Sequence, residues 1–259
     1  MITAILARRR ILLAKQSGEV LPTDMVLLIN SPNTGDFSVT TNYGTFTAAK
    51  VSDYPYFGTT VTHKLSMSNV TFSTGITISD DSAVRGLFVG VESWGTSNTY
   101  TNTSNLFYEC SSLRGIPASW EGLGAVNNST GMFAFCTSLT SVPSSWEGLG
   151  MLTDAIGMFG SCTSLTSVPS SWEGLWMLTN AINMFGGCTS LTNCGTIFTG
   201  LAKATNVSKL FDACTGMQGD IHALYVYLST KPIAVTSFVS CFHNCTQAVG
   251  YDLIPASWK

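Results

Sequence analysis

The sequence predicts a mainly β fold with short helices, arranged as a solenoid of stacked coils with 26 residues in each coil. Three observations lead to this fold class: a strict 26-residue period, a low content of charge, and an abundance of Ser, Thr and Gly. Charged residues make up 10% of the 259-residue chain and hydrophobic residues 45%. A chain with this much apolar sequence can bury a sizeable core and is not a candidate for disorder.

A Met/Leu-Phe-x-x-Cys motif carries the period and recurs five times in steps of 26 residues. Leucine, proline and tryptophan follow the motif at fixed distances, and the run CTSLTSVPSSWEGL occurs unchanged in two consecutive units. Such a period is the signature of repeat architectures, in which each unit buries its apolar side chains against its neighbours. The predicted repeat core consists of Phe107, Cys110, Phe133, Cys136, Phe159, Cys162, Phe185, Cys188, Phe211 and Cys214.

The first element is a basic segment, for which the sequence predicts a short amphipathic helix over residues 1–20. Gly18 and Pro22 mark its end. An isolated helix of this length is marginal in water, so we expect the segment to dock on a partner protein and to act as an anchor. The predicted anchor residues are Ile2, Ile5, Leu6, Arg8, Arg9, Arg10, Leu12 and Leu13.

The search for targeting segments and the net charge exclude two features, a membrane span and a nucleic-acid partner. The apolar run Ile11–Ala14 after the arginine cluster is too short for a secretory signal, and no stretch approaches the ~20 apolar residues that span a bilayer. The net charge is −3, which gives no overall field that favours nucleic acid. The sequence therefore predicts no membrane span and no nucleic-acid partner.

Residues 21–100 predict a small β-rich domain that also caps the solenoid. Met25–Asn30 is an apolar run that ends in a Ser-Pro-Asn-Thr-Gly turn, as a buried strand does. Three further strands are expected at Phe37–Thr41, Gly58–Thr62 and Val70–Phe72.

Residues 101–259 predict the repeat solenoid, with an insertion at about 219–238 and degenerate units at both ends. Ser-Leu-Thr-Ser-Val-Pro alternates polar and apolar residues like a short half-buried strand that proline ends. Asp154–Cys162 has the apolar spacing of a helical turn. One short parallel strand and one helical turn in each unit are the plan of a leucine-rich-repeat-type solenoid.

The MFxxCxSLTSxP core, from Asn105 to Lys259, resembles the 26-residue "bacterial surface protein" repeat, a relative of the BspA-like leucine-rich repeats. This resemblance implies that Phe and Cys lie inside the coil, that no catalytic motif is present, and that the protein serves adhesion or attachment. Such repeats occur in bacterial surface proteins and in structural proteins of phages that infect gut bacteria. The arginine-rich opening is similar to the N-termini of phage fibre and adaptor proteins.

The cysteines favour a buried ladder of reduced thiols over a disulfide ladder, because equivalent positions in a stack have parallel rather than converging Cβ directions. Cys241-x-His243-x-Cys245, with Cys188 and Cys194, could suggest a metal site. However, Phe242 and Cys245 occupy the repeat's own positions, so the repeat explains the cluster. We expect no metal and no cofactor.

Catalytic residues are sparse. None of His63, His222 and His243 stands in a nucleophile motif, and Asp80-Asp81 is a turn-like pair rather than a convincing pair of glycosidase carboxylates. The sequence therefore predicts that the protein is not an enzyme. A polysaccharide-degrading enzyme remains as a weaker alternative.

Trp120, Trp146 and Trp172 form a column in the repeat, with two interpretations. Exposed indoles on a charge-poor wall would stack on the sugar rings of a glycan. Alternatively, each indole closes its own coil against the next unit, as repeated aromatic residues do in stacked repeats.

These features together predict a structural or attachment protein of a phage virion, as a head or tail fibre or an adaptor. The N-terminal segment would bind other virion proteins, and the solenoid would present a protein- or glycan-binding surface to a receptor on the cell. The low charge also predicts homo-oligomers, since little repulsion keeps copies apart. The alternative is an adhesin of the same repeat family on the bacterial cell surface.

Overall fold

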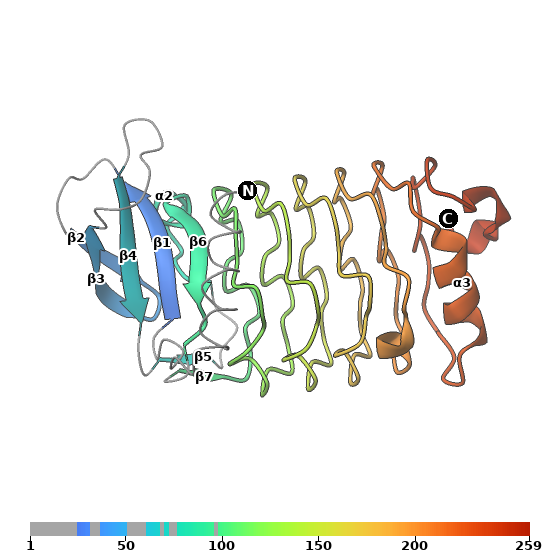
Figure 1. Ribbon diagram of the computed structural model, residues 1–259, viewed down its shortest axis with the longest axis horizontal. Coiled ribbons are helices and arrows are strands. Elements are labelled where there is room, and N and C mark those ends of the chain that lie inside the picture. Colours follow the sequence, from blue (N-terminus) through green and yellow to red (C-terminus); the bar gives the residue numbers. More distant parts are fainter. Residues whose placement is uncertain (1–24, 32–36, 51–60, 68–69, 73–76, 96–97) are drawn as a thin grey trace, which may run out of the picture.

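The computed structural model describes residues 25–31, 37–50, 61–67, 70–72, 77–95 and 98–259. The described chain is elongated: a β-sheet covers one end of a stack of coils, and a helix lies across the other end (Figure 1). The predicted anchor residues lie outside the described ranges, namely Ile2, Ile5, Leu6, Arg8, Arg9, Arg10, Leu12 and Leu13.

A five-stranded antiparallel sheet with the order β2-β3-β4-β1-β6 forms the N-terminal end. β1 is the apolar run that the sequence marks as a strand; it lies between β4 and β6, and its side chains Leu27, Leu28 and Ile29 are buried. Two-residue strands β5 and β7 pair in parallel beside this sheet. The bounds are Met25–Ser31 for β1, Phe37–Thr41 for β2, Gly44–Lys50 for β3, Val61–Met67 for β4, Thr71–Phe72 for β5, Phe88–Ser93 for β6 and Thr99–Tyr100 for β7.

The edge strand β6 joins the sheet to the first coil. Gly90 forms a parallel bridge with Gly115, and the amide of Val91 donates to the carbonyl of Gly115 at 3.0 Å. A side chain at Gly90 would press on Leu28, because an added Cβ would lie 3.2 Å from Leu28 Cδ1. Sheet and coils therefore share one continuous hydrophobic core.

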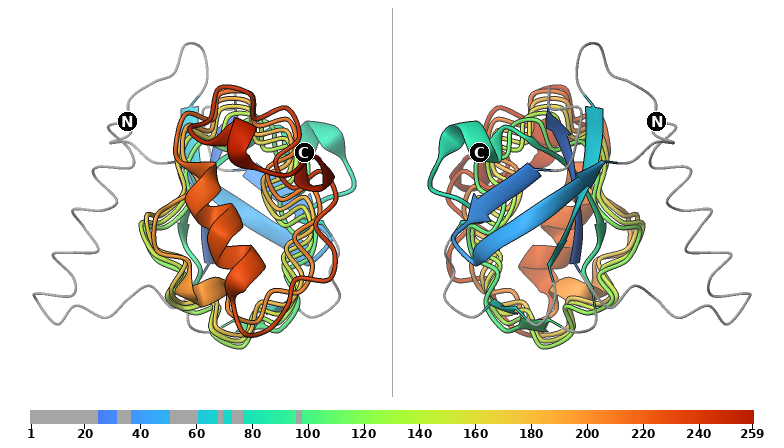
Figure 2. Two further views of the ribbon diagram at one scale, coloured as in Figure 1. Left: turned by 90° about the vertical axis from the view of Figure 1, so that its right-hand side faces the viewer. Right: turned by 90° about the vertical axis from the view of Figure 1, so that its left-hand side faces the viewer.

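Each coil is held to the next by backbone hydrogen bonds between equivalent residues. Single parallel bridges link Asn102 to Asn128, Asn128 to Asp154 and so on through Asn206 to Ser237. The coil spacing is visible in the core, where the stacked rings of Phe133 and Phe159 are 5.4 Å apart. The coils superimpose when they are viewed along the stack (Figure 2).

The predicted leucine-rich-repeat-type solenoid is wrong. The protein is mainly β with few helices, but residues 101–198 form turns and isolated bridges, with neither the parallel strand nor the helical turn expected in each unit. Proline in the Ser-Val-Pro-Ser-Ser segment lacks an amide for a strand ladder. The expected helical turn is interrupted by left-handed residues, Gly157 at φ 57° and Ser161 at φ 58°.

The C-terminal end of the stack is covered by α3, Ile221–Thr230, which lies within the predicted insertion at 219–238 (Figures 1 and 2). Asp220 caps it by accepting a hydrogen bond from the amide of Ala223 at 3.0 Å. The buried Lys231 then donates through Nζ to the carbonyl of Ala204 at 2.7 Å, which ties the end of α3 to the last regular coil. Three short 3₁₀ turns complete this half: η1 at Thr199–Leu201, η2 at Tyr251–Leu253 and η3 at Ala256–Trp258.

The remaining helix, α2, is the single turn Ser82–Arg85 before β6, and Asp81 caps it through a 2.8 Å hydrogen bond from the amide of Ala83. Neither α2 nor α3, the α-helices of the described ranges, is long and apolar enough to cross a membrane.

Candidate binding surfaces

The tryptophan column lies inside the stack. Trp120, Trp146 and Trp172 are each 0% exposed, and the rings of Trp120 and Trp146 stack at 6.0 Å with an interplanar angle of 11°. A sugar has no exposed indole face to stack on at these positions, so the glycan-stacking interpretation of the column is wrong. The physical reason is that the indoles pack on the phenylalanine column, as Trp146 does on Phe159 at 6.2 Å.

The indole N–H groups also hold coils together. Trp120 Nε1 donates to the carbonyl of Ser145 in the following coil at 3.1 Å, and Trp172 Nε1 donates to the carbonyl of Cys194 at 2.8 Å. Trp146 Nε1 is buried and has no hydrogen-bond partner. This column is therefore structural, and one of its members carries an unsatisfied donor.

The repeat cysteines are unpaired, buried thiols that donate hydrogen bonds between coils. Cys162 Sγ donates to the carbonyl of Phe133 in the preceding coil at 3.1 Å, and Cys188 Sγ bonds the carbonyl of Phe159 in the same way. Burial raises the pKa of Cys162 to about 12 from the ordinary value of 9.0, so the thiol stays protonated as a donor near neutral pH. The sequence pattern places these side chains in the core but does not reveal the hydrogen bond.

All ten residues of the predicted repeat core are fully buried. They are Phe107, Cys110, Phe133, Cys136, Phe159, Cys162, Phe185, Cys188, Phe211 and Cys214.

The Cys-x-His-x-Cys segment does not bring its side chains together. Cys241 and Cys245 are fully buried, whereas His243 is exposed and its Nδ1 lies 2.8 Å from Asp212 Oδ1. Within the described ranges, no group of three or more His, Cys, Asp and Glu side chains could hold a metal ion. Burial raises the pKa of Cys241 well above its usual value, so this thiol is poorly suited to act as a nucleophile.

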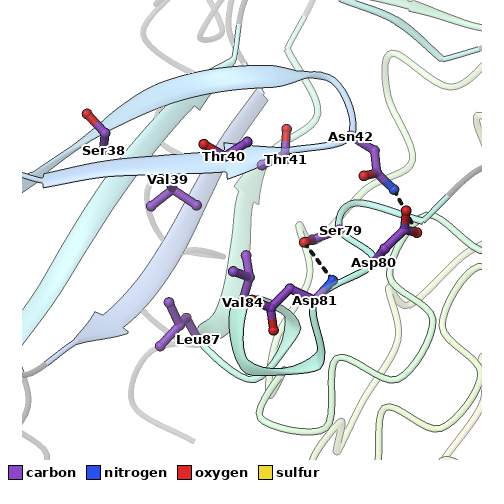
Figure 3. A pocket seen from close by; sticks show the side chains of 10 residues that line it. All are labelled: Ser38, Val39, Thr40, Thr41, Asn42, Ser79, Asp80, Asp81, Val84 and Leu87. Carbon is purple, nitrogen blue, oxygen red and sulfur yellow. Dashed lines mark hydrogen bonds between the residues drawn. The ribbon is translucent and has the colours of Figure 1, made fainter.

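A cavity of about 350 Å³ lies between the turn after β2 and the loop before α2 (Figure 3). Asn42 Nδ2 donates to Asp80 Oδ1 at 3.1 Å and to the carbonyl of Thr77 at 3.0 Å, which ties the hairpin to the loop. Ser79 Oγ accepts a hydrogen bond from the amide of Asp81 at 3.2 Å. The lining residues are Ser38, Val39, Thr40, Thr41, Asn42, Ser79, Asp80, Asp81, Val84 and Leu87.

The two carboxylates of this cavity hold the local fold. Asp80 accepts from Asn42, Asp81 caps α2, and Arg85 Nη1 braces the loop by donating to the carbonyl of Asp80 at 2.9 Å. Arg85 Nη2 also pairs with Glu109 in the first coil at 2.9 Å. The cavity is therefore the joint between the cap and the stack, with its acidic side chains used in that joint.

The described histidines do not form a catalytic set with these carboxylates. His243 pairs with Asp212 near the end of the stack, and His222 lies on α3, where its ring is 5.9 Å from that of Tyr225. His63 belongs to β4, but its side chain lies outside the described part of the structure.

One side of the coil stack is an uncharged surface that we call the hydroxyl wall, formed by residues 139–145, 165–171 and 191–197. Exposed Thr166, Thr192 and Thr196 lie on this wall, and the hydroxyl of each donates to a carbonyl of the preceding coil, for example Thr192 Oγ1 to Thr166 O at 2.9 Å. Because the hydroxyl protons point along the stack, the oxygen lone pairs remain as regularly spaced acceptors for a partner.

A second exposed feature lies at the turn that follows the buried tryptophan in each coil. There Trp176 is 51% exposed, while the other five tryptophans of the chain are at most 6% exposed. Sequence reasoning missed Trp176 because it followed only the tryptophans in phase with the repeat. The signal was available, since Trp176 stands where neighbouring units have Gly124, Gly150 and Ala202.

Part of the coil stack is similar to a known protein family. A family model described as "Mycoplasma protein of unknown function, DUF285" matches residues 80–198, which run from the loop before α2 into the coil stack. This repeat family is related to the BspA-like surface repeat proteins. No curated protein and no solved structure matches the chain.

Proposed function

We propose that this chain is a non-catalytic attachment protein whose coil stack presents the hydroxyl wall to a receptor. The observation that supports this function is an uncharged surface, repeated over consecutive coils, on a stack that is covered at both ends. Thr140, Thr166 and Thr192 hold equivalent positions in three coils, so several weak contacts act together on an extended partner.

A phage virion is the first proposed setting. Residues 1–20 carry Arg8–Arg10 among apolar residues and would bind other virion proteins, which leaves the stack to meet a protein or glycan on the host cell. Many copies in one particle would turn weak contacts into firm attachment.

A bacterial cell-surface adhesin is the second proposed setting. The match of residues 80–198 to a Mycoplasma family related to surface repeat proteins favours it. The mode of attachment through the wall is the same in both settings, so one surface test serves both.

The test compares two matched triple variants in a cell-binding assay with fluorescently labelled protein. Thr166, Thr192 and Thr196 change to Val on the wall, and Thr153, Thr179 and Thr205 change to Val outside the wall's segments. Each triple removes three hydroxyl-to-carbonyl hydrogen bonds between coils. The control triple also removes the 2.9 Å hydrogen bond from Thr153 to Asp154, so its loss of stability should be at least as large. We expect the wall triple to bind cells about tenfold more weakly or worse, and the control triple to bind like the wild type.

Equal binding by both triples would contradict attachment through the wall. The setting is tested by deleting residues 1–20 and following the protein into purified phage particles and into the cell envelope fraction. Loss from particles with retained folding supports the virion, whereas recovery in the envelope of uninfected cells supports the adhesin.

A further inference from the structure

Trp176 is exposed at a position where the coil needs no side chain. The equivalent residues Gly124 and Gly150 occupy the same turn in the two preceding coils, and Ala202 occupies it in the following one. A large apolar side chain in water gains nothing for folding, and an exposed apolar cluster with a polar rim marks a contact surface. The indole is therefore an addition to the repeat rather than a part of it.

Apolar and cationic side chains from adjacent coils extend this contact surface. Met151, in the coil before, is 54% exposed, and Met177 follows Trp176 directly. Lys203 of the next coil reaches back, with its Nζ 2.9 Å from Met177 Sδ, so side chains at this edge touch across coils.

Carboxylates occupy the equivalent turn of two successive coils. Glu173 lies three residues before Trp176, and Glu147 is its equivalent in the preceding coil; both are exposed. Glu173 Oε1 accepts a 3.5 Å hydrogen bond from the hydroxyl of Thr199, one coil further along. We call the surface formed by Glu147, Met151, Glu173, Trp176, Met177 and Lys203 the Trp176 edge.

We propose that the Trp176 edge is a carbohydrate-binding subsite. The apolar face of one pyranose ring stacks on the indole of Trp176, and the carboxylates of Glu173 and Glu147 accept hydrogen bonds from hydroxyls of that ring and the next. Lys203 donates to a ring or hydroxyl oxygen at the far side. An exposed aromatic plate with a few placed polar groups is the chemistry of sugar recognition.

The coil spacing supports an extended glycan as the occupant. Stacked core rings in successive coils lie 5.4 Å to 5.6 Å apart, which is close to the length of one pyranose unit in an extended chain. Glu147 and Glu173 repeat with that step, so one carboxylate meets each successive sugar. A protein partner would instead call for a broad apolar patch, whereas here one indole and two methionines lie among the charged side chains of Glu147, Glu173 and Lys203.

This inference goes beyond the proposed function, because the Trp176 edge is a surface separate from the hydroxyl wall, and it names a ligand class. Its test measures binding of cellohexaose, chitohexaose and isomaltohexaose to the full chain by calorimetry and by tryptophan emission, since Trp176 is the exposed indole among six. We expect one of these to bind and to shift the emission to shorter wavelength. Trp176→Gly, which restores the residue of the neighbouring coils, should weaken binding about tenfold or more, and Glu173→Gln about two- to fivefold.

The matched control is Val226→Ser, which removes an exposed apolar side chain from α3 and should leave sugar binding unchanged. Binding of no oligosaccharide by the wild type, or equal binding by Trp176→Gly, overturns the subsite. If the wall variants still lose cell binding in that case, the attachment function stands without the subsite. Retained cell binding by the wall triple together with sugar binding lost in Trp176→Gly would support the subsite and contradict the wall.

Discussion

The sheet of β1, β2, β3, β4 and β6 and the coil stack solve the same packing problem in opposite ways. In the sheet, regular backbone ladders set the register, such as Leu27 opposite Leu65, while the side chains follow no repeated pattern. In the stack, the backbone is a series of turns with single bridges, while the side chains recur every 26 residues. Regularity can therefore be carried by side-chain columns when the backbone lacks regular secondary structure.

Alkaline pH should produce the largest difference in stability between the two regions, because all eight cysteines lie in the stack, from Cys110 to Cys245. Burial raises the pKa of Cys162 and Cys245 to about 12 from 9.0, and the other thiols shift in the same direction. Between these values the unfolded chain releases protons that the folded chain retains. The unfolding free energy then falls by up to about 1.4 kcal/mol per buried thiol with each pH unit between these two values.

We expect cooperative unfolding of the stack as the pH rises above about 9, and little effect of these thiols below it. Tryptophan fluorescence during a titration from about pH 8 to about pH 11 measures it, because the tryptophans lie in the stack or at its first edge. The double variant Cys136→Ala, Cys162→Ala should reduce the slope by about a quarter. Tryptophan emission that stays typical of buried indoles at the highest pH of the titration would contradict the prediction.

Truncation of a large buried side chain should show how far a loss of stability spreads in each region. Phe159→Ala empties a site in the phenylalanine column and should lower the unfolding free energy by about 3–5 kcal/mol. Native-state hydrogen exchange should show the loss mainly in the coils that contact it, since stacked repeats interact with their nearest neighbours. Leu27→Ala in β1 is the matched change, with about 2–5 kcal/mol lost from the amides of the sheet. If both variants lost hydrogen-exchange protection equally throughout the chain, the stack and the sheet would not differ in how far damage spreads.

Glycine substitutions should test the tight turns of the stack. Gly174 has φ +103°, and an added Cβ would lie 2.5 Å from the backbone carbon of Trp146, so Gly174→Ala should cost about 2–4 kcal/mol. Gly124→Ala is the control in the stack, since nothing lies within 4 Å of its added Cβ. Gly86→Ala, at φ −65° beside α2, is the control near the sheet. Thermal unfolding of the three variants measures the difference, and a stable Gly174→Ala protein would show that adjacent coils can move apart.

The smallest effect concerns the indole donors. Trp120→Phe removes a 3.1 Å hydrogen bond to Ser145, whereas Trp146→Phe removes a donor that has no partner. Both changes remove the same volume, so Trp120→Phe should be more destabilising by about 1 kcal/mol. Chemical denaturation of the two variants provides the comparison, and a larger loss for Trp146→Phe would mean that its N–H is satisfied in solution.

The sequence predicts the period and the buried residues of the repeat well, because side-chain spacing follows directly from stacking. Its secondary structure was predicted wrongly, because the alternation in Ser-Leu-Thr-Ser-Val-Pro suits a strand and an extended irregular segment equally. The left-handed residues at Gly157 and Ser161 are not visible as such, since serine rarely adopts that conformation. In the sheet, the apolar run Met25–Asn30 predicts β1, whereas β3, with its Thr and Ala residues, was not expected.

The candidate surfaces were harder to predict than the core. A repeated tryptophan is compatible with both a buried and an exposed column, and only the packing against Phe159 decides between them. Trp176 became visible through its departure from the repeat. In a periodic chain, the residues that break the pattern are better guides to binding than those that keep it.

The unchanged run CTSLTSVPSSWEGL in two successive units shows that one coil can follow another through identical junctions. Duplicating or deleting a whole unit then lengthens or shortens the protein by one fixed step, without any new kind of joint having to evolve. The number of repeat units in the gene would in this way set the length of the stack, while the sheet at one end and α3 at the other stay the same.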